Sequence, residues 1–133
     1  MKLNVWMAAK AVVEVIFGIG FVLMPKFMGG TFGMNFDASA ALMAQLFGAA
    51  FIFGSIVLWL ARNVDRDDVA CRAILIAVVV SNAIGFIVTL MASLSGVWNA
   101  MGWLPVLLYL VFGLAFAYFL FMKPAAGKKS AKR

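Results

Sequence analysis

Four long apolar runs dominate the sequence and restrict the folds open to it. They cover residues 3–24, 38–61, 69–92 and 103–122. About 20 helical residues are needed to span a hydrocarbon core roughly 30 Å thick, so each run is long enough to cross a bilayer. The sequence therefore predicts an all-α, polytopic membrane protein built as a four-transmembrane-helix bundle.

The composition agrees with burial in lipid. Apolar residues make up 66% of the chain and charged residues 12%, whereas soluble domains average about 45–50% and about 25%. Too little polar surface is available to cover a soluble fold. We expect residues 1–123 to form one transmembrane domain, with no second domain. Because Lys10 and Glu14 interrupt the first run and no small-x-small cleavage pattern follows it, we do not expect a removable signal peptide.

The positive charges predict how the chain is oriented. The net charge is +6, and the Lys and Arg residues gather around residues 62–72 and 123–133, while the segment 93–102 has none. Because cytoplasmic loops of membrane proteins are rich in Lys and Arg, both termini and the second loop are predicted to face the cytoplasm of a cell with an inner membrane. Residues 124–133 are expected to be a disordered basic tail. The bilayer, not a nucleic acid, is the predicted partner of these charges.

Proline and aspartate mark the predicted helix ends. Pro25 cannot continue a helix cheaply, so the first helix is expected to end before it. Residues 25–36 are predicted to form an outer-surface loop. Asp37 or Ser39 is expected to cap the second helix, and one of the aspartates in 65–68 the third, because their side-chain oxygens accept hydrogen bonds from free N–H groups.

A faint internal repeat appears at a constant offset of 65 residues. Residues 19–21 match residues 84–86, and residues 46–51 resemble residues 111–116. The same offset relates the first helix to the third and the second to the fourth, as a duplicated helical hairpin would. Chance similarity between apolar sequences is the alternative.

Small residues at four-residue spacing mark faces on which helices approach closely. In lipid, helix association relies on close backbone packing and interhelical hydrogen bonds. We favour packing within the bundle for these positions, with self-association or contact with other membrane subunits as the alternative. The residues are Ala44, Gly48, Ala77, Ser81 and Gly85.

Glu14 is the most informative residue, since it lies near the middle of the first apolar run. A charge at the bilayer centre costs roughly 2.5–3.5 kcal/mol on insertion scales, so Glu14 needs a partner or a proton. Lys10 is one helical turn away on the same face and is the predicted partner.

Four further polar residues are predicted at a similar depth: Gln45, Ser81, Asn82 and Tyr109. Together with Lys10 and Glu14 they suggest a midplane pocket for a proton, an ion or the polar end of a lipophilic molecule. The alternative is a hydrogen-bond network that only fixes helix packing. The sequence does not decide between these two interpretations.

The sequence gives little support for a disulfide, a catalytic set, a metal site or a phosphate-binding loop. The chain has no histidine and one cysteine, Cys71, so no disulfide, catalytic set or metal site is predicted within it. Cys71 is expected to be a structural thiol. Gly18-Ile-Gly20 lies inside a predicted helix with no preceding strand, which argues against a phosphate-binding loop. No cofactor is predicted.

Several short motifs resemble those of small bacterial four-helix membrane proteins, loosely of the DoxX-like group. The resemblance implies the fold and brings no activity or site residues with it. It is carried by Met24-Pro25, residues 44–48, residues 59–62, Ser95-Gly96, Asn99 and Gly102-Trp103.

Three functions follow from the sequence as hypotheses. The first is a non-enzymatic accessory or scaffold subunit of a membrane complex, favoured because no catalytic set is predicted. The second is a small transporter, channel or lipophile-binding protein that uses the pocket around Glu14. The third is a membrane enzyme acting on a lipid or quinone, with Glu14 as its acid/base group.

Overall fold

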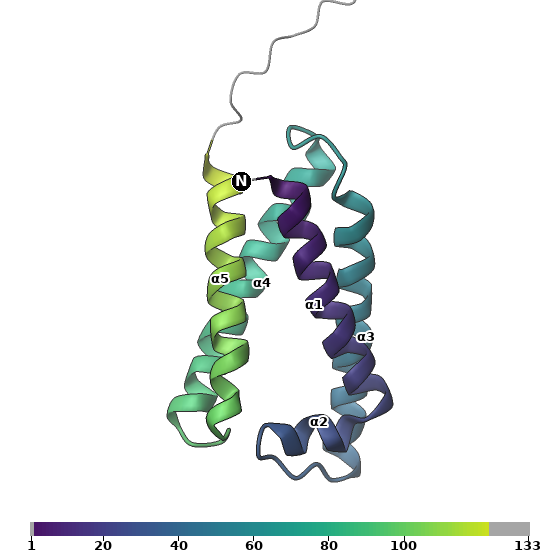
Figure 1. The fold of residues 1–133 in the computed structure, drawn as a ribbon, viewed down its shortest axis with the longest axis vertical. Helices are drawn as coiled ribbons and strands as arrows, with labels where there is room; N and C mark the ends of the chain where they lie inside the picture. Colours follow the sequence, from purple (N-terminus) through teal and green to yellow (C-terminus); the bar gives the residue numbers. More distant parts are fainter. Residues whose placement is uncertain (1, 123–133) are drawn as a thin grey trace, which may run out of the picture.

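The computed structural model describes residues 2–122, which fold into five α-helices and one 3-10 helix (Figure 1). Three of the α-helices are each long and apolar enough to cross a membrane, and so is the 3-10 helix taken together with the α-helix that follows it. The chain is a small multi-pass integral membrane protein, and the predicted all-α four-helix bundle is confirmed. The predicted tail, 124–133, lies outside the described residues. The elements are α1 (Leu3–Leu23), α2 (Pro25–Thr31), α3 (Ala38–Ala61), α4 (Val69–Leu94), η1 (Ala100–Gly102) and α5 (Trp103–Phe121).

Two of the predicted caps are present. The Asp37 carboxylate accepts a hydrogen bond of 2.7 Å from the backbone N–H of Ala40 at the start of α3. Asp68 accepts one of 2.7 Å from the N–H of Ala70 at the start of α4. Each carboxylate satisfies an N–H group that has no partner within its helix.

The segment after Pro25 differs from the prediction. Residues 25–31 were expected to be a loop and instead form the seven-residue helix α2, with Pro25 at its first position. Proline suits that position, because its fixed φ matches a helix and its missing N–H would have no intrahelical partner there. Pro25 therefore ends α1, as predicted, and also starts a new helix.

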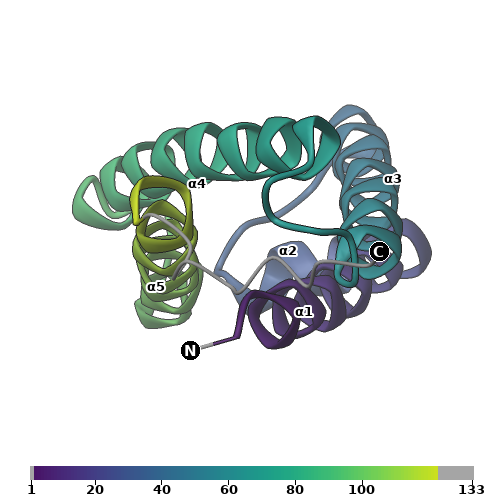
Figure 2. The same cartoon turned by 90° about the horizontal axis from the view of Figure 1, so that it is seen from above.

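The four long helices pair as two hairpins. α1 packs along α3, α4 packs along α5, and the main contact between the hairpins is made by α1 and α5. The hairpins lie close together at one end of the bundle and lean apart toward the other (Figure 1). The first end carries the N-terminus and is called the N-terminal end. The second carries α2 and is called the α2 end. Seen from above, α2 lies beneath the space among the four helices (Figure 2).

Glycine allows α1 and α3 to touch at the backbone. A methyl group added to Gly48 would lie 2.7 Å from the backbone oxygen of Gly18, and one added to Gly18 would lie 2.9 Å from that of Gly48. Ser55 and Gln45, on either side of this crossing, donate hydrogen bonds of 2.8 and 3.0 Å to α1 carbonyls. The crossing thus combines the close approach and interhelical hydrogen bonds that hold membrane helices together.

Glycine also shapes the contact between α4 and α5. The Tyr109 ring lies directly on Gly85, where any side chain would collide with it. Gly113 faces Asn82, since an added methyl group would lie 3.5 Å from the Asn82 Cβ. Gly48 and Gly113 are separated by the 65-residue offset, and each faces the first helix of its own hairpin. Gly48 and Gly85 are therefore used in packing within the chain.

A hydrophobic core closes the N-terminal end of the bundle. All four long helices contribute to it, and Cys71 is a fully buried free thiol within it. At the same end, the Arg66 guanidinium donates a hydrogen bond to the Met122 carbonyl and lies 5.9 Å from the Phe119 ring centre. The buried core residues are Met7, Ala11, Leu58, Ala61, Cys71, Leu75, Phe112 and Phe116.

Contacts between the segments that connect the helices join the two hairpins at the α2 end. The rings of Phe32 and Trp98 lie 5.5 Å apart, and the Trp98 indole N–H donates to the Met34 sulfur at 3.0 Å. The Asn99 side chain donates to the Thr31 carbonyl at 3.0 Å, and its backbone N–H donates to the Phe32 carbonyl at 3.0 Å. The hairpins are thus joined at both ends of the bundle.

The two glycines related by the offset provide a test of this packing. Gly48→Ala should lower the free energy of unfolding by about 1–3 kcal/mol, because the added methyl group overpacks a backbone contact. Gly113→Ala adds the same methyl group at an ordinary contact distance and should change it by less than about 0.5 kcal/mol. Unfolding by SDS in mixed micelles measures both values. Equal losses in the two variants would contradict the α1–α3 crossing.

Candidate functional site

A cavity of about 790 Å³ lies between the two hairpins. Its walls are formed by α1, α3, α4 and α5, and Phe32, Met34 and Trp98 line it at the α2 end. The walls are mainly apolar side chains. Pockets that bind small molecules measure about 300–1,000 Å³ and have mainly apolar walls with a few polar groups, so the size and lining are those of a ligand site.

The cavity opens sideways between α3 and α4. All of its lining residues on α1 and α5 are buried or half-buried, whereas several on α3 and α4 are exposed. α4 begins beside the end of α3 and inclines away from it toward the α2 end (Figure 1). Since both helices are apolar enough to lie in a membrane, this opening faces lipid. The exposed lining residues are Phe47, Ala50, Phe53, Ala77, Ser81, Ile84 and Val88.

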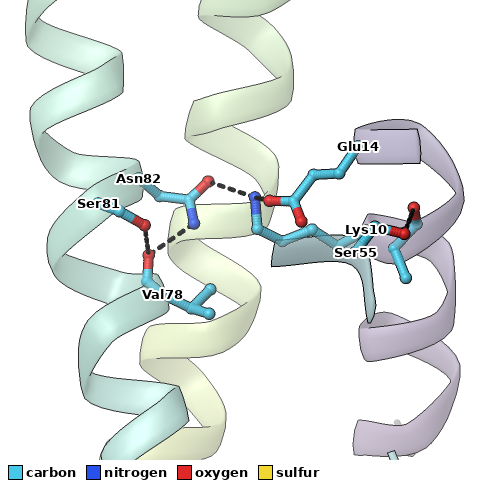
Figure 3. Close-up of polar contacts among 7 residues, drawn as sticks. Lys10, Glu14, Ser55, Val78, Ser81 and Asn82 are labelled. Atoms are coloured by element: carbon cyan, nitrogen blue, oxygen red, sulfur yellow. Dashed lines mark hydrogen bonds and ion pairs between the residues drawn. The ribbon is translucent and has the colours of Figure 1, made fainter. Parts of the chain in front are cut away.

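A buried ion pair forms the polar end of the cavity (Figure 3). Lys10 Nζ lies 2.9 Å from Glu14 Oε1, and the two side chains are only 7% and 12% exposed. Lys10 Nζ also donates to Asn82 Oδ1 at 3.4 Å and lies 5.3 Å from the centre of the Phe112 ring. The predicted pairing of Lys10 with Glu14 is confirmed, and Asn82 connects the pair to the other hairpin.

The polar groups of α4 are held by their own helix. The Asn82 amide donates to the Val78 carbonyl at 2.6 Å, and the Ser81 hydroxyl donates to the same carbonyl at 3.1 Å (Figure 3). Thr89, farther along the cavity wall, donates to the Gly85 carbonyl at 2.7 Å. These bonds use the Ser81 and Thr89 hydroxyls and one N–H of the Asn82 amide, whose oxygen Oδ1 accepts from Lys10.

One oxygen of Glu14 has no partner. Oε2 is buried and makes no hydrogen bond among the described residues, while Oε1 pairs with Lys10. Gly54 on α3 lies beside it, since a methyl group added there would come within 2.9 Å of Oε2. Leaving a buried polar atom unpaired costs about 1–3 kcal/mol, and more for a charged group. The cavity therefore contains one strong hydrogen-bond acceptor, Glu14 Oε2, that receives no hydrogen bond from the described residues.

Five of the six predicted pocket residues line this cavity: Lys10, Glu14, Ser81, Asn82 and Tyr109. Tyr109 lies on Gly85, about one turn from Asn82 toward the α2 end. Gln45 is the exception, since it is exposed outside the cavity and its side chain donates to the Val22 carbonyl on α1. Depth in the membrane suggested Gln45, but depth does not determine which face of α3 a residue occupies.

The sequence did not indicate Gly54 or Trp98 as site residues. Nothing in the sequence places Gly54 beside a carboxylate. Trp98 lies in a loop and reaches the cavity through its contacts with Phe32 and Met34. Within residues 2–122, no group of three or more His, Cys, Asp or Glu side chains comes together to hold a metal ion.

Comparison of the chain with protein-family models, curated proteins and solved structures found no match. The resemblance to DoxX-like proteins therefore stays a prediction.

The ion pair generates a stability prediction. Lys10→Met leaves the Glu14 carboxylate buried without its counter-charge and should lower the free energy of unfolding at neutral pH by about 3–5 kcal/mol. The double variant Lys10→Met/Glu14→Gln removes both charges and should recover most of that loss. Unfolding of the two variants in bicelles gives the comparison. If the single variant is as stable as the double one, the two side chains do not form a coupled buried pair.

Proposed function

We propose that this integral membrane protein binds a lipophilic molecule that has a polar end, taking it up sideways from the bilayer. The observation that carries the proposal is the cavity of about 790 Å³ between the hairpins, which opens on lipid and ends at the buried Lys10–Glu14 pair. The apolar body of the ligand occupies the space among α1, α3, α4 and α5. Its polar end lies at the ion pair.

The cavity favours binding over a network that only fixes helix packing. The bond from Lys10 to Asn82 links the two hairpins, but it does not require an open apolar space beside it. Protein interiors pack closely and leave few voids larger than a water molecule. A space of this size in contact with a polar cluster is what a ligand site needs.

The same geometry separates the remaining hypotheses. The hydrophobic core and the Phe32–Trp98 contact block the two ends of the cavity, which favours a binding site over a continuous channel. Glu14 is the one acidic side chain that lines the cavity, and Lys10 holds it, which suits fixing a ligand better than transferring a proton. The accessory-subunit hypothesis stays a prediction, since no described feature bears on it.

We infer that the N-terminal end faces the cytoplasm across an inner membrane. Arg62, Arg66 and Arg72 lie at or beside the loop between α3 and α4, at that end of the bundle, and cytoplasmic loops are rich in such residues. The Arg62 guanidinium lies 3.9 Å from the Trp59 ring centre, an arrangement that suits a membrane interface. The cavity and its lateral opening then lie toward the outer leaflet.

Reporter fusions test this orientation. Fusions after Lys26 and after Ser95 should report an external location, and a fusion after Arg66 should report the cytoplasm. Alkaline phosphatase and green fluorescent protein make a matched pair of reporters, because each is active on one side only. An external signal at Arg66 would contradict the proposed orientation.

A substitution that fills the cavity tests the proposed function. Ala77→Phe places a ring inside the opening on α4, whereas Ala83→Phe places the same ring on a lipid-exposed position of that helix outside the cavity. The protein is purified in mild detergent and its lipophilic molecules are extracted and identified by mass spectrometry. A molecule retained in stoichiometric amount by wild type and Ala83→Phe should be lost from Ala77→Phe. Identical extracts from all three proteins would contradict the proposal.

A further inference from the structure

We propose that the polar end of the ligand is an uncharged hydroxyl group that donates a hydrogen bond to Glu14 Oε2. This inference rests on the proposed function and narrows it to a chemical class: a long-chain, isoprenoid, polycyclic or phenolic alcohol. Three observations carry it. They are the free hydrogen-bonding capacity at the polar end, the net charge there, and the position of Tyr109.

The buried side-chain atom without a hydrogen bond next to the ion pair is an acceptor. Lys10 Nζ is directed at Glu14 Oε1, Asn82 Oδ1 and the Phe112 ring. The Asn82 amide and the Ser81 hydroxyl donate to the Val78 carbonyl. Glu14 Oε2 is buried and accepts nothing among the described residues. A ligand that carries only acceptors, such as an ether, offers no hydrogen for this oxygen.

The charge at this end of the cavity is already balanced. Lys10 and Glu14 neutralise each other at 2.9 Å, and Glu14 is the one acidic side chain in the lining while Lys10 is the one basic side chain there. A carboxylate or phosphate on the ligand would bring a second negative charge beside Glu14, and an ammonium group a second positive charge beside Lys10. Burying an uncompensated charge is costly. The site therefore selects a neutral donor.

Tyr109 supplies the complementary donor. The lining contains three hydroxyl groups, and those of Ser81 and Thr89 donate to carbonyls of their own helix. The third belongs to Tyr109, whose ring lies on Gly85 about one turn from Asn82. A tyrosine hydroxyl both donates and accepts. A ligand hydroxyl that gives its hydrogen to Glu14 keeps lone pairs with which to accept from Tyr109.

Three probes that share one apolar body test the inference. They are farnesol, which has a hydroxyl group, farnesyl methyl ether, which has only an acceptor, and farnesoic acid, which is anionic at neutral pH. Binding to the full-length protein is measured by calorimetric titration in detergent micelles. A hydrogen bond to a charged group is strong enough that farnesol should bind at least about tenfold more tightly than either other probe. Ala77→Phe gives the background from partition into the micelle.

Gly54→Ala blocks access to Glu14 Oε2, the atom that is expected to distinguish farnesol from the other probes. Its methyl group occupies the space beside Glu14 Oε2, so the preference for farnesol over the methyl ether should fall to less than about threefold. The control, Gly113→Ala, adds the same methyl group outside the lining and should keep the full preference. If Gly54→Ala does not fold, Lys10→Met/Glu14→Gln replaces it. That double variant lacks the carboxylate and should show the same loss of preference.

The outcomes separate this inference from the proposed function. Equal binding of farnesol and the methyl ether to wild type, with both lost in Ala77→Phe, would overturn the hydroxyl inference and leave the binding function standing. Tighter binding of farnesoic acid would overturn the argument from charge balance. Binding of every probe at the Ala77→Phe background would overturn both proposals, with a water molecule then the natural partner of Oε2.

Discussion

Two opposite charges on one helix must be kept out of hydrocarbon, and the arrangement of this bundle depends on that constraint. Lys10 and Glu14 lie one turn apart on α1 and neutralise each other at 2.9 Å. A charge at the bilayer centre is expensive, so the pair must also be covered by protein. α3 covers it with Gly54, and α4 contributes Asn82 as a hydrogen-bond partner. The pair therefore determines which faces of three helices point inward.

Close backbone packing builds the hairpins that surround the pair. Lipid offers no hydrophobic force between helices, so α1 and α3 are held by the Gly18–Gly48 contact and by hydrogen bonds from Ser55 and Gln45. The two hairpins meet in the core at one end and through the Phe32–Trp98 contact at the other. Between these two ends Lys10 bonds to Asn82, and the cavity occupies the space beside that bond. The packing that stabilises each hairpin thus also creates the space for a ligand.

The sequence predicted the features that depend on local pattern. Apolar runs of sufficient length predicted the four long helices, and Asp37 and Asp68 were among the predicted caps. The polar residues of the site were found because a charge in lipid needs partners at its own depth. The face of the helix on which each residue lies was not predictable in this way. Gln45 was therefore grouped with residues that it does not approach. The helix after Pro25 has a local reason, since proline suits the first position of a helix. The position of Gly54 beside Glu14 depends on a tertiary contact that no local pattern encodes.

Glu14 is the only glutamate in the 133 residues, so the central claim can be tested with a single label. The protein is labelled with ¹³C at the side-chain carboxyl carbon of glutamate and with ¹⁵N at lysine Nζ, and it is then placed in bilayers. Solid-state NMR gives one signal from a side-chain carboxyl group. We predict a chemical shift typical of an ionised carboxylate, dephasing by a lysine ¹⁵N, and a further shift when farnesol is added but not when its methyl ether is added. A protonated carboxyl without dephasing, unaffected by either probe, would contradict a buried ion pair at the end of a ligand cavity.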